Sequence, residues 1–432
     1  MEYQNTLQFA QSLDEQDPLK EFQQQFLVPK HNGKDAIYLC GNSLGLQPIT
    51  ARQYVNAQFS NWQNLAIEGF FEGDDPWLNY HQQLTGTLAG IVGAKKEEVS
   101  VMNSLTVNLH LLMVSFYIPT NKRFKILVEG GAFPSDQYAF ASQARFHGFD
   151  PKEAIIEVFP REGESTLRTE DIVQQINTHA DELALVLFGG INYYTGQFYD
   201  LPAISKAGHA AGAYVGFDLA HAAGNVMLKL HDWDIDFATW CSYKYMNSGP
   251  GGISGIFVHE MHFGNKALQR FEGWWGNRLD NRFLMAPQFD PEIGAAGWQL
   301  STIPVMLLAL HKASLDIFEQ AGFATLRGKS ESLTGYLEFL INGINHEEDE
   351  ELFKIITPQN KEERGCQLSI VCKRNAKAIF NFLTANGVIG DWREPNVIRL
   401  SPVPLYNSFT QVFEAGRVLA AAARDWRSET RG

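Results

Sequence analysis

The chain has 432 residues, of which 45% are apolar and 19% are charged, a composition typical of globular proteins and not of disordered or fibrous ones. Its formal net charge of -14, without any Lys- and Arg-rich block, argues against nucleic acid and anionic membranes as partners. The N-terminus lacks the basic start and apolar centre of a signal peptide. The longest apolar run, 109–118, falls short of the roughly 20 residues that a membrane span needs. A soluble cytoplasmic protein is therefore expected.

Between residues 60 and 305, short apolar runs typical of buried strands alternate with amphipathic segments typical of helices. The expected strands are FKILVEG (124–130), AIIEVF (154–159), LALVLFGG (183–190), AYVGFD (213–218), DFATWC (236–241) and GISGIFV (252–258). Helical patterns, among them 169–180 and 202–212, separate several of them. This alternation predicts an α/β domain with a mostly parallel central sheet.

The pattern changes after Pro304, where residues 305–322 form a long segment that is apolar on one face and ends at glycine. Such a segment predicts a helix between two domains. Beyond it, the strand candidates CQLSIVC and NVIRLSPV alternate with helical segments such as NAKAIFNFLTANG. We therefore expect an N-terminal segment (1–60) that packs on the small domain, a large domain (61–310) and a smaller C-terminal α/β domain (311–432).

Two polar residues follow expected strands of the large domain: Asp218 ends the run 213–218, and Lys244 comes shortly after the run 236–241. Ligands of open parallel sheets bind at the carboxyl ends of the strands, where these two side chains can face one crevice. A buried lysine without a fixed anion has a lowered pKa and forms an imine with a carbonyl. A buried aspartate needs a cation, such as the protonated pyridine nitrogen of pyridoxal phosphate. The alternative is an exposed lysine and a helix-capping aspartate that never meet.

The phosphate of such a cofactor needs hydroxyls, backbone N–H groups and often the start of a helix. Ser104 and Thr106 lie at one expected loop-to-helix junction, and Ser135 and Asp136 lie at another. Serine and threonine also cap helices without any ligand, so these positions alone do not decide. Tyr243 is the better candidate, because a phenol beside the lysine can bind phosphate and also transfer protons.

Seven motifs, in order along nearly the whole chain, resemble the kynureninase family: CGNSLGLQP (40–48), MNSLTVNLHLLM (102–113), AFPSDQYA (132–139), YYTGQ (193–197), GFDLAHAAGN (216–225), HDWDIDFATWCSYKYMNSGPGG (231–252) and SPVPLYNSF (401–409). The resemblance implies a homodimeric pyridoxal-phosphate enzyme of fold type I, the aspartate-aminotransferase fold. Members hydrolyse kynurenine to anthranilate and alanine, in tryptophan degradation and in the supply of pyridine-nucleotide precursors.

Matched position by position, the resemblance makes Lys244 the Schiff-base lysine, Asp218 the partner of the pyridine nitrogen and His221 a neighbour of the cofactor. The remaining cofactor contacts that it implies are Leu105, Thr106, Phe133, Pro134, Ser135, Asp136, Gly189 and Tyr243, with Phe133 stacked on the ring and Tyr243 also catalytic. Trp274 and Thr302 match positions that reach the site from the neighbouring subunit. Arg399 matches the arginine that binds the substrate α-carboxylate, for which a bidentate fork is suited.

Three positions depart from the family pattern. Phe70 stands where animal-type members have a histidine at the substrate ring, and Thr302 stands where they have an asparagine. Gly189 replaces a serine of the cofactor site. Because two polar groups are lost near the aryl ring, we expect kynurenine to be preferred over 3-hydroxykynurenine, so that Phe70 and Thr302 act as substrate-binding positions.

Other functions remain to be weighed. Within the same fold, a cysteine desulfurase usually has histidine where this chain has Tyr243, and an aminotransferase is compatible with the same lysine and aspartate. A metal-dependent hydrolase is an alternative from another class, with ligands among Asp218, His221, His231, Asp232, Asp234 and Asp236. No HExxH motif occurs, and the four cysteines form no CxxC pair, so neither a metal site nor a disulfide framework is expected. A non-catalytic binding protein on an enzyme scaffold is disfavoured by the retained Lys, Asp, His, Tyr and Arg set.

Overall fold

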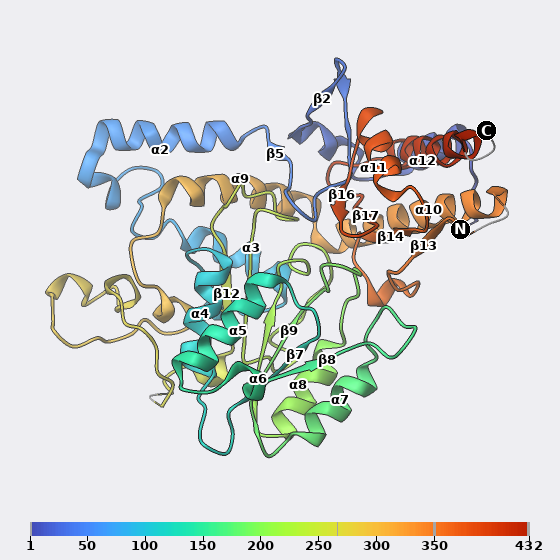
Figure 1. Cartoon of the computed structure of the whole chain (residues 1–432). Coiled ribbons are helices and arrows are strands. Elements are labelled where there is room, and N and C mark those ends of the chain that lie inside the picture. The colour runs from blue at the N-terminus through green and yellow to red at the C-terminus, as the bar shows by residue number, and fades with distance from the viewer. Residues whose placement is uncertain (1, 266, 349–350, 430–432) are drawn as a thin grey trace. The chain divides into compact units, whose positions relative to one another are not determined.

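The computed structural model describes residues 2–265, 267–348 and 351–429, and the chain divides into two compact units (Figure 1). The larger unit comprises Ala51–Tyr193 and Tyr199–Leu315. The smaller unit comprises Met1–Thr50, Tyr194–Phe198 and Asp316–Gly432. One five-residue segment of the smaller unit, Tyr194–Phe198, thus interrupts the larger unit in the sequence.

A seven-stranded sheet forms the centre of the larger unit, in the order β6-β12-β11-β10-β9-β7-β8. Its strands are β6 (Val99–Val101), β7 (Lys125–Glu129), β8 (Ile155–Val158), β9 (Leu183–Gly189), β10 (Tyr214–Asp218), β11 (Phe237–Trp240) and β12 (Gly255–Val258). The strands from β11 to β8 run parallel, whereas β12 is antiparallel to both β11 and β6. The predicted mostly parallel sheet is therefore confirmed.

The helices around this sheet are α3 (Gln82–Val92), α4 (Leu105–Phe116), α5 (Pro134–Phe146), α6 (Pro151–Ala154), α7 (Thr169–Thr178) and α8 (Leu201–Ala210), as Figure 1 shows. Helix α2 (Ala51–Leu65) extends away from the sheet, and α9 (Val305–Ala321) contains the boundary between the units. Helices α4 and α5 pack on each other, and so do α7 and α8. One core cluster joins alternate residues of the strands, such as Val128 and Leu187, to Leu112 and Phe116 of α4. The intervening residues are buried too, which explains why these strands read as continuous apolar runs.

Local sequence sets where several helices begin and end. The Asp200 side chain accepts a hydrogen bond from the backbone N–H of Ala203 (3.0 Å) and so caps α8. Pro134 occupies the first turn of α5, where its missing N–H costs nothing. Gly93 ends α3 with φ +64°, and a Cβ at this position would lie 2.1 Å from the carbonyl oxygen of Leu228. Only glycine fits there.

The smaller unit combines an antiparallel sheet, in the order β13-β14-β17-β16, with helices from both ends of the chain. Its longer elements are α1 (Leu7–Gln16), α10 (Phe323–Glu348), β13 (Phe353–Ile355), β14 (Leu368–Cys372), α11 (Ala376–Ala385), β16 (Asp391–Arg393), β17 (Val397–Leu400) and α12 (Phe409–Glu429). Two-residue strands pair as β1 (Phe26–Leu27) with β5 (Gln47–Pro48), β2 (Lys30–His31) with β3 (Lys34–Asp35), and β4 (Ile37–Tyr38) with β15 (Val388–Ile389). Its core joins Ala10, Leu13 and Leu39 to residues of α10 and α12. Among the helices described, none has both the length and the apolar character needed to cross a membrane.

A buried carboxylate, Asp236, joins three elements just before β11. It accepts hydrogen bonds from the backbone N–H of Val215 (2.6 Å) and from the Nε2 atoms of His209 (2.9 Å) and His262 (2.7 Å). Burial alone would raise the pKa of Asp236, but the two histidine hydrogen bonds hold that pKa below its usual value. The hydrogen bond to Asp236 in turn raises the pKa of His209. This carboxylate ties α8, β10 and the chain after β12 together.

We expect Asp236→Asn to lower the free energy of unfolding by about 3 kcal/mol, because one partner of a buried charged network is lost. The depressed Asp236 pKa stabilises the fold above pH 4 and loses this effect as pH falls, whereas the raised His209 pKa stabilises it at low pH and loses this effect as pH rises. Denaturant titration should therefore show the largest loss of unfolding free energy between pH 4 and the pH at which His209 loses its proton. The control Asp150→Asn, at an exposed helix cap where asparagine serves equally well, should cost almost nothing.

Candidate active site

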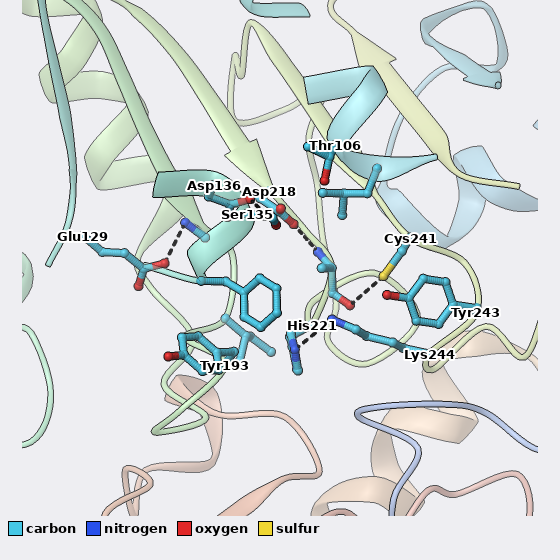
Figure 2. A pocket seen from close by; sticks show the side chains of 15 residues that line it. Thr106, Glu129, Ser135, Asp136, Tyr193, Asp218, His221, Cys241, Tyr243 and Lys244 are labelled. Carbon is cyan, nitrogen blue, oxygen red and sulfur yellow. Dashed lines mark hydrogen bonds between the residues drawn. The ribbon is translucent and has the colours of Figure 1, made fainter. Parts of the chain in front are cut away.

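A cavity opens at the carboxyl edge of the seven-stranded sheet, where β7, β9 and β10 end in Glu129, Gly189 and Asp218. Gly189 and Asp218 are register partners on adjacent strands. Figure 2 shows the side chains that converge on it. The cavity is lined by Leu105, Thr106, Glu129, Phe133, Ser135, Asp136, Gly189, Ile191, Tyr193, Asp218, Ala220, His221, Cys241, Tyr243 and Lys244. All of them belong to the larger unit.

Lys244 reaches this cavity because β11 is buried along its whole length and delivers the following residues to the sheet edge. Its Nζ atom lies 3.0 Å from Nε2 of His221, which is buried in the segment after β10. Lys244 and His221 point toward each other in Figure 2. The lysine amine thus has a neighbour that can exchange a proton with it.

Two buried carboxylates, Asp218 and Asp136, lie together on another part of the cavity wall (Figure 2). The Asp218 carboxylate accepts a hydrogen bond of 2.7 Å from the backbone N–H of Ala220. Burial raises the pKa of Asp136 well above its usual value, and the neighbouring Asp218 and Glu129 charges raise it further. Asp136 therefore holds a proton and donates it in a hydrogen bond to Asp218. The pair presents one negative charge to a ligand.

Tyr243 and Cys241 form a second hydrogen-bonded pair beside the lysine. The Tyr243 hydroxyl bonds to the Cys241 thiol, whose Sγ lies 3.9 Å from the carbonyl oxygen of Ala220. Burial, together with Cys241, raises the pKa of Tyr243, and burial raises the pKa of the Cys241 thiol. Both groups are protonated at neutral pH, so Tyr243 can donate a proton.

Helices α4 and α5 both begin at the cavity. Thr106 lies in the first turn of α4 and Ser135 in the first turn of α5. Ser104 and Phe133 stand at the N-cap positions, and neither side chain makes a capping hydrogen bond. In the first turn of α5, Pro134 has no N–H and the N–H of Asp136 donates to the carbonyl oxygen of Phe133 (2.9 Å). The start of α4, together with the hydroxyls of Thr106 and Ser135, is therefore best suited to an anion such as a phosphate.

Comparisons with known proteins agree with this geometry. A family model described as the kynureninase C-terminal domain matches residues 326–419. A kynureninase of Flavobacterium psychrophilum is 56% identical over 422 residues, which cover 97% of this chain and 98% of that protein. A kynureninase of Nematostella vectensis is 47% identical, covering 96% of this chain and 93% of that protein. The chain belongs to the kynureninase family.

Solved structures at lower identity show the fold of this family member. A cysteine desulfurase from Thermococcus onnurineus superposes with a TM-score of 0.74 at 15% identity, covering 90% of this chain and 95% of that one. A variant of the protein C-DES, with glycine covalently linked to its pyridoxal-phosphate cofactor, has a TM-score of 0.71 at 16% identity, covering 89% and 96%. These likenesses confirm the predicted fold type. Membership of the kynureninase family confirms the predicted class of pyridoxal-phosphate enzyme.

The cavity collects most of the positions that the sequence predicted for a kynureninase site. Ten of them line it: Leu105, Thr106, Phe133, Ser135, Asp136, Gly189, Asp218, His221, Tyr243 and Lys244. Pro134 is the first residue of α5 and does not itself line the cavity. Sequence reasoning did not single out Glu129, Ile191, Tyr193, Ala220 and Cys241, which also line it. The sequence did carry a signal for Glu129, because this polar residue follows the apolar residues of the run 124–130 as Asp218 follows those of its own strand.

The other predicted positions lie outside the cavity lining. The Phe70 ring packs edge-on against Trp77 and Trp275, with centroids 5.3 and 6.3 Å apart. Trp274 is 45% exposed and donates from Nε1 to the carbonyl oxygen of Arg282 (3.1 Å). Thr302 is exposed. Their roles toward substrate and partner subunit remain predictions.

Arg399 belongs to the smaller unit, on β17, and is fully buried. Its guanidinium forms an ion pair with Asp391 (2.7 Å) and donates a hydrogen bond to the Ser43 hydroxyl (3.3 Å). Ser43 also donates to Asp391. Both contacts are made by Nη2 of the arginine.

The structure separates the residues of the alternative metal centre. Asp218 and His221 line the cavity, whereas Asp236 is bound to two other histidines and His231 contacts Glu98 at 2.9 Å. Among the described residues, a group that can hold a metal ion comprises Glu98, His231 and His259. Both ring nitrogens of His259 already have backbone partners, Met261 N and His231 O. A metal-dependent hydrolase centred on the proposed cluster therefore finds no support.

The donor set of the cavity fits pyridoxal phosphate. A buried carboxylate pair with a single charge suits a protonated pyridine nitrogen, an amine suits the aldehyde, and the start of α4 suits the phosphate. Phe133 is 42% exposed in the cavity wall, an aromatic face that a stacked ring would cover.

We expect Asp136→Asn to change how the stability of the cofactor-free protein depends on pH. Because the pKa of Asp136 is raised in the folded protein, its proton contributes to the free energy of unfolding below the unfolded pKa near 4. This contribution is lost as pH rises toward the folded pKa. Asparagine keeps a donor to Asp218 and cannot ionise. Between pH 5 and pH 8, the free energy of unfolding of the variant should therefore fall by about 1 kcal/mol less than that of the wild type. Chemical denaturation at both pH values measures this, and the exposed Asp74→Asn should leave the difference unchanged.

Proposed function

We propose that this protein hydrolyses kynurenine to anthranilate and alanine, with pyridoxal 5'-phosphate bound covalently at Lys244. The observation that carries the proposal is the convergence of Lys244, Asp218 and Tyr243 on one cavity, in a chain 56% identical to a kynureninase. The bound cofactor supplies an electrophilic carbon and an electron-accepting ring that stabilises negative charge on the substrate.

Asp218 holds the pyridine nitrogen of the cofactor in its protonated form. The proton on Asp136 keeps the pair at a single negative charge, which the pyridinium neutralises. Thr106, Ser135 and Tyr243 bind the phosphate together with the N–H groups that start α4. Leu105 and Phe133 contribute apolar contacts to the same ligand.

Once the substrate amine has taken its place on the cofactor, the freed Lys244 amine would act as the general base that removes the proton from the α-carbon of kynurenine. His221, 3.0 Å from Nζ, can take part in returning that proton or moving it on. Tyr243 keeps its proton at neutral pH, which supports a role as the donor when anthranilate departs and alanine is formed. Its hydroxyl is oriented by the contact with Cys241.

Arg399 binds the α-carboxylate of the substrate, which rests on its match to the family arginine. The Asp391 and Ser43 contacts support this role, because they hold the guanidinium plane in one orientation. Phe70 and Thr302 contact the aryl ring and offer it no charged group, so kynurenine is preferred over 3-hydroxykynurenine.

The protein acts as a cytoplasmic homodimer in which Trp274 and Thr302 of one subunit contribute to the site of the other. The exposure of both side chains supports this arrangement. Its metabolic role is tryptophan degradation through kynurenine, with the supply of pyridine-nucleotide precursors as a second use of the product.

A cysteine desulfurase, which shares the fold, needs a reactive thiolate near the substrate. Cys241 lines the cavity, but its side chain is buried and its pKa is raised by burial. Catalytic thiolates instead have lowered pKa values and solvent access. The cavity therefore favours hydrolysis of kynurenine over sulfur transfer.

We expect Lys244→Ala to lower kcat by at least about 1000-fold and to abolish the covalent absorption band of the cofactor, because the base and the bonding amine are both removed. Anthranilate fluorescence measures the activity. The exposed Lys229→Ala serves as the control and should keep both the band and the activity. Full activity of Lys244→Ala would contradict the proposal.

We expect the wild-type enzyme to have the higher kcat/KM for kynurenine, and the double variant Phe70→His with Thr302→Asn to shift the ratio by about tenfold toward 3-hydroxykynurenine. The reason is that a polar group at the ring gains a hydrogen bond to the extra hydroxyl. Steady-state kinetics with both substrates tests this. Phe71→His, which alters the exposed neighbouring residue, should leave the ratio as it is.

A further inference from the structure

Glu129 is a buried carboxylate in the wall of the active-site cavity to which the mechanism above assigns no role. It is the last residue of β7, two strands away from the end of β10 that carries Asp218. Burial raises the pKa of Glu129, and three hydrogen-bond donors oppose this effect. Burying a carboxylate is costly, and three hydrogen bonds offset this cost at Glu129. Such an arrangement points to a specific role for the side chain.

The three donors come from one stretch of chain. The backbone N–H of Gly189 donates to Oε1 (3.2 Å), and Asn192 Nδ2 (2.9 Å) and the Tyr199 hydroxyl donate to Oε2. Asn192 and Tyr199 flank the segment Tyr194–Phe198, which belongs to the smaller unit. The Glu129 carboxylate therefore binds the chain on both sides of residues 194–198.

The segment Tyr194–Phe198 is itself tied to residues of the smaller unit. The Ser369 hydroxyl donates to the carbonyl oxygen of Tyr194 (2.6 Å), and the Thr357 hydroxyl donates to that of Thr195 (2.6 Å). Gln197 forms a β-bridge with Arg364. The Glu129 contacts are made to residues of the larger unit on either side of this segment.

The cavity wall depends on the same contacts. Tyr193 follows Asn192 directly and lines the cavity, and its ring packs edge-to-face on Phe133 with centroids 5.2 Å apart. Phe133 is the residue expected to stack on the cofactor ring. A shift of Asn192 would move Tyr193 and remove the support behind Phe133.

Gly189 provides the space for this arrangement. A Cβ at position 189 would lie 2.6 Å from Glu129 Oε1 and would displace the carboxylate from its donors. Gly189, which stands in place of the expected serine, thus leaves room for the Glu129 carboxylate.

We propose that Glu129 is a positioning residue of the cofactor pocket, which acts through Asn192 and Tyr199 to hold the Tyr193–Phe133 wall. The proposal rests on the function proposed above, because it assumes that the cavity binds pyridoxal phosphate. Cofactor binding then orders residues 190–199, and loosening these contacts weakens cofactor binding.

The experiment compares Tyr199→Phe and Glu129→Gln with Tyr117→Phe in the full-length protein. Tyr117 is a matched control in the same unit, because its buried side chain likewise donates one hydrogen bond (2.7 Å, to the carbonyl oxygen of Phe124) and it does not line the cavity. Both test variants should raise the Kd for pyridoxal phosphate about tenfold, the cost of one charge-assisted hydrogen bond. Tyr117→Phe should lose similar thermal stability and keep the wild-type Kd.

Amide hydrogen exchange supplies the second measurement. In the wild type, pyridoxal phosphate should slow exchange over residues 190–199, and in Tyr199→Phe this protection should be reduced. If Glu129→Gln fails to fold, the more conservative Tyr199→Phe still decides. Equal cofactor affinity and equal protection in Tyr199→Phe and Tyr117→Phe would overturn the proposal, whereas failure of the wild type to bind the cofactor would overturn the proposed function instead.

Discussion

Three buried carboxylates, Glu129, Asp136 and Asp218, surround one side of a cavity that also contains Lys244. The ends of parallel strands meet at one edge of the sheet, so topology alone brings Glu129 and Asp218 together. Such charges are tolerated in a protein interior only when protons or hydrogen bonds offset them. The site achieves this with a shared proton between Asp136 and Asp218, and with three donors around Glu129.

The arrangement of charges and hydrogen-bond donors also defines which ligand the cavity can bind. A cationic ring nitrogen matches the Asp218 pair, and an anionic group matches the start of α4 with the hydroxyls of Thr106 and Ser135. A ligand that carries both charges at opposite ends can satisfy the two regions at once, which a simple anion or a simple cation cannot do. The polarity of the cavity therefore selects for a molecule shaped like pyridoxal phosphate.

Much of this arrangement was predictable from the sequence, because the decisive residues follow apolar runs that read clearly as strands. Asp218 ends β10 and Lys244 lies just beyond β11, and parallel neighbours must deliver both to one edge. Glu129 was not predicted, since its partners Asn192 and Tyr199 lie 63 and 70 residues away and no local pattern links them. Strand β6 was also not recognised, because three residues are too few to show a period.

The smaller unit illustrates how a compact unit can be discontinuous in sequence. Strand β4 near the N-terminus pairs with β15, and Ala10, Leu13 and Leu39 complete a core built mainly by α10, α12 and the strands between them. The matched family segment, 326–419, contains none of these three residues. Cut out as a contiguous C-terminal fragment, it would expose the apolar surface that they cover. The N-terminal 50 residues thus complete the core of the C-terminal part of this unit, so a contiguous C-terminal fragment would lack part of its own core.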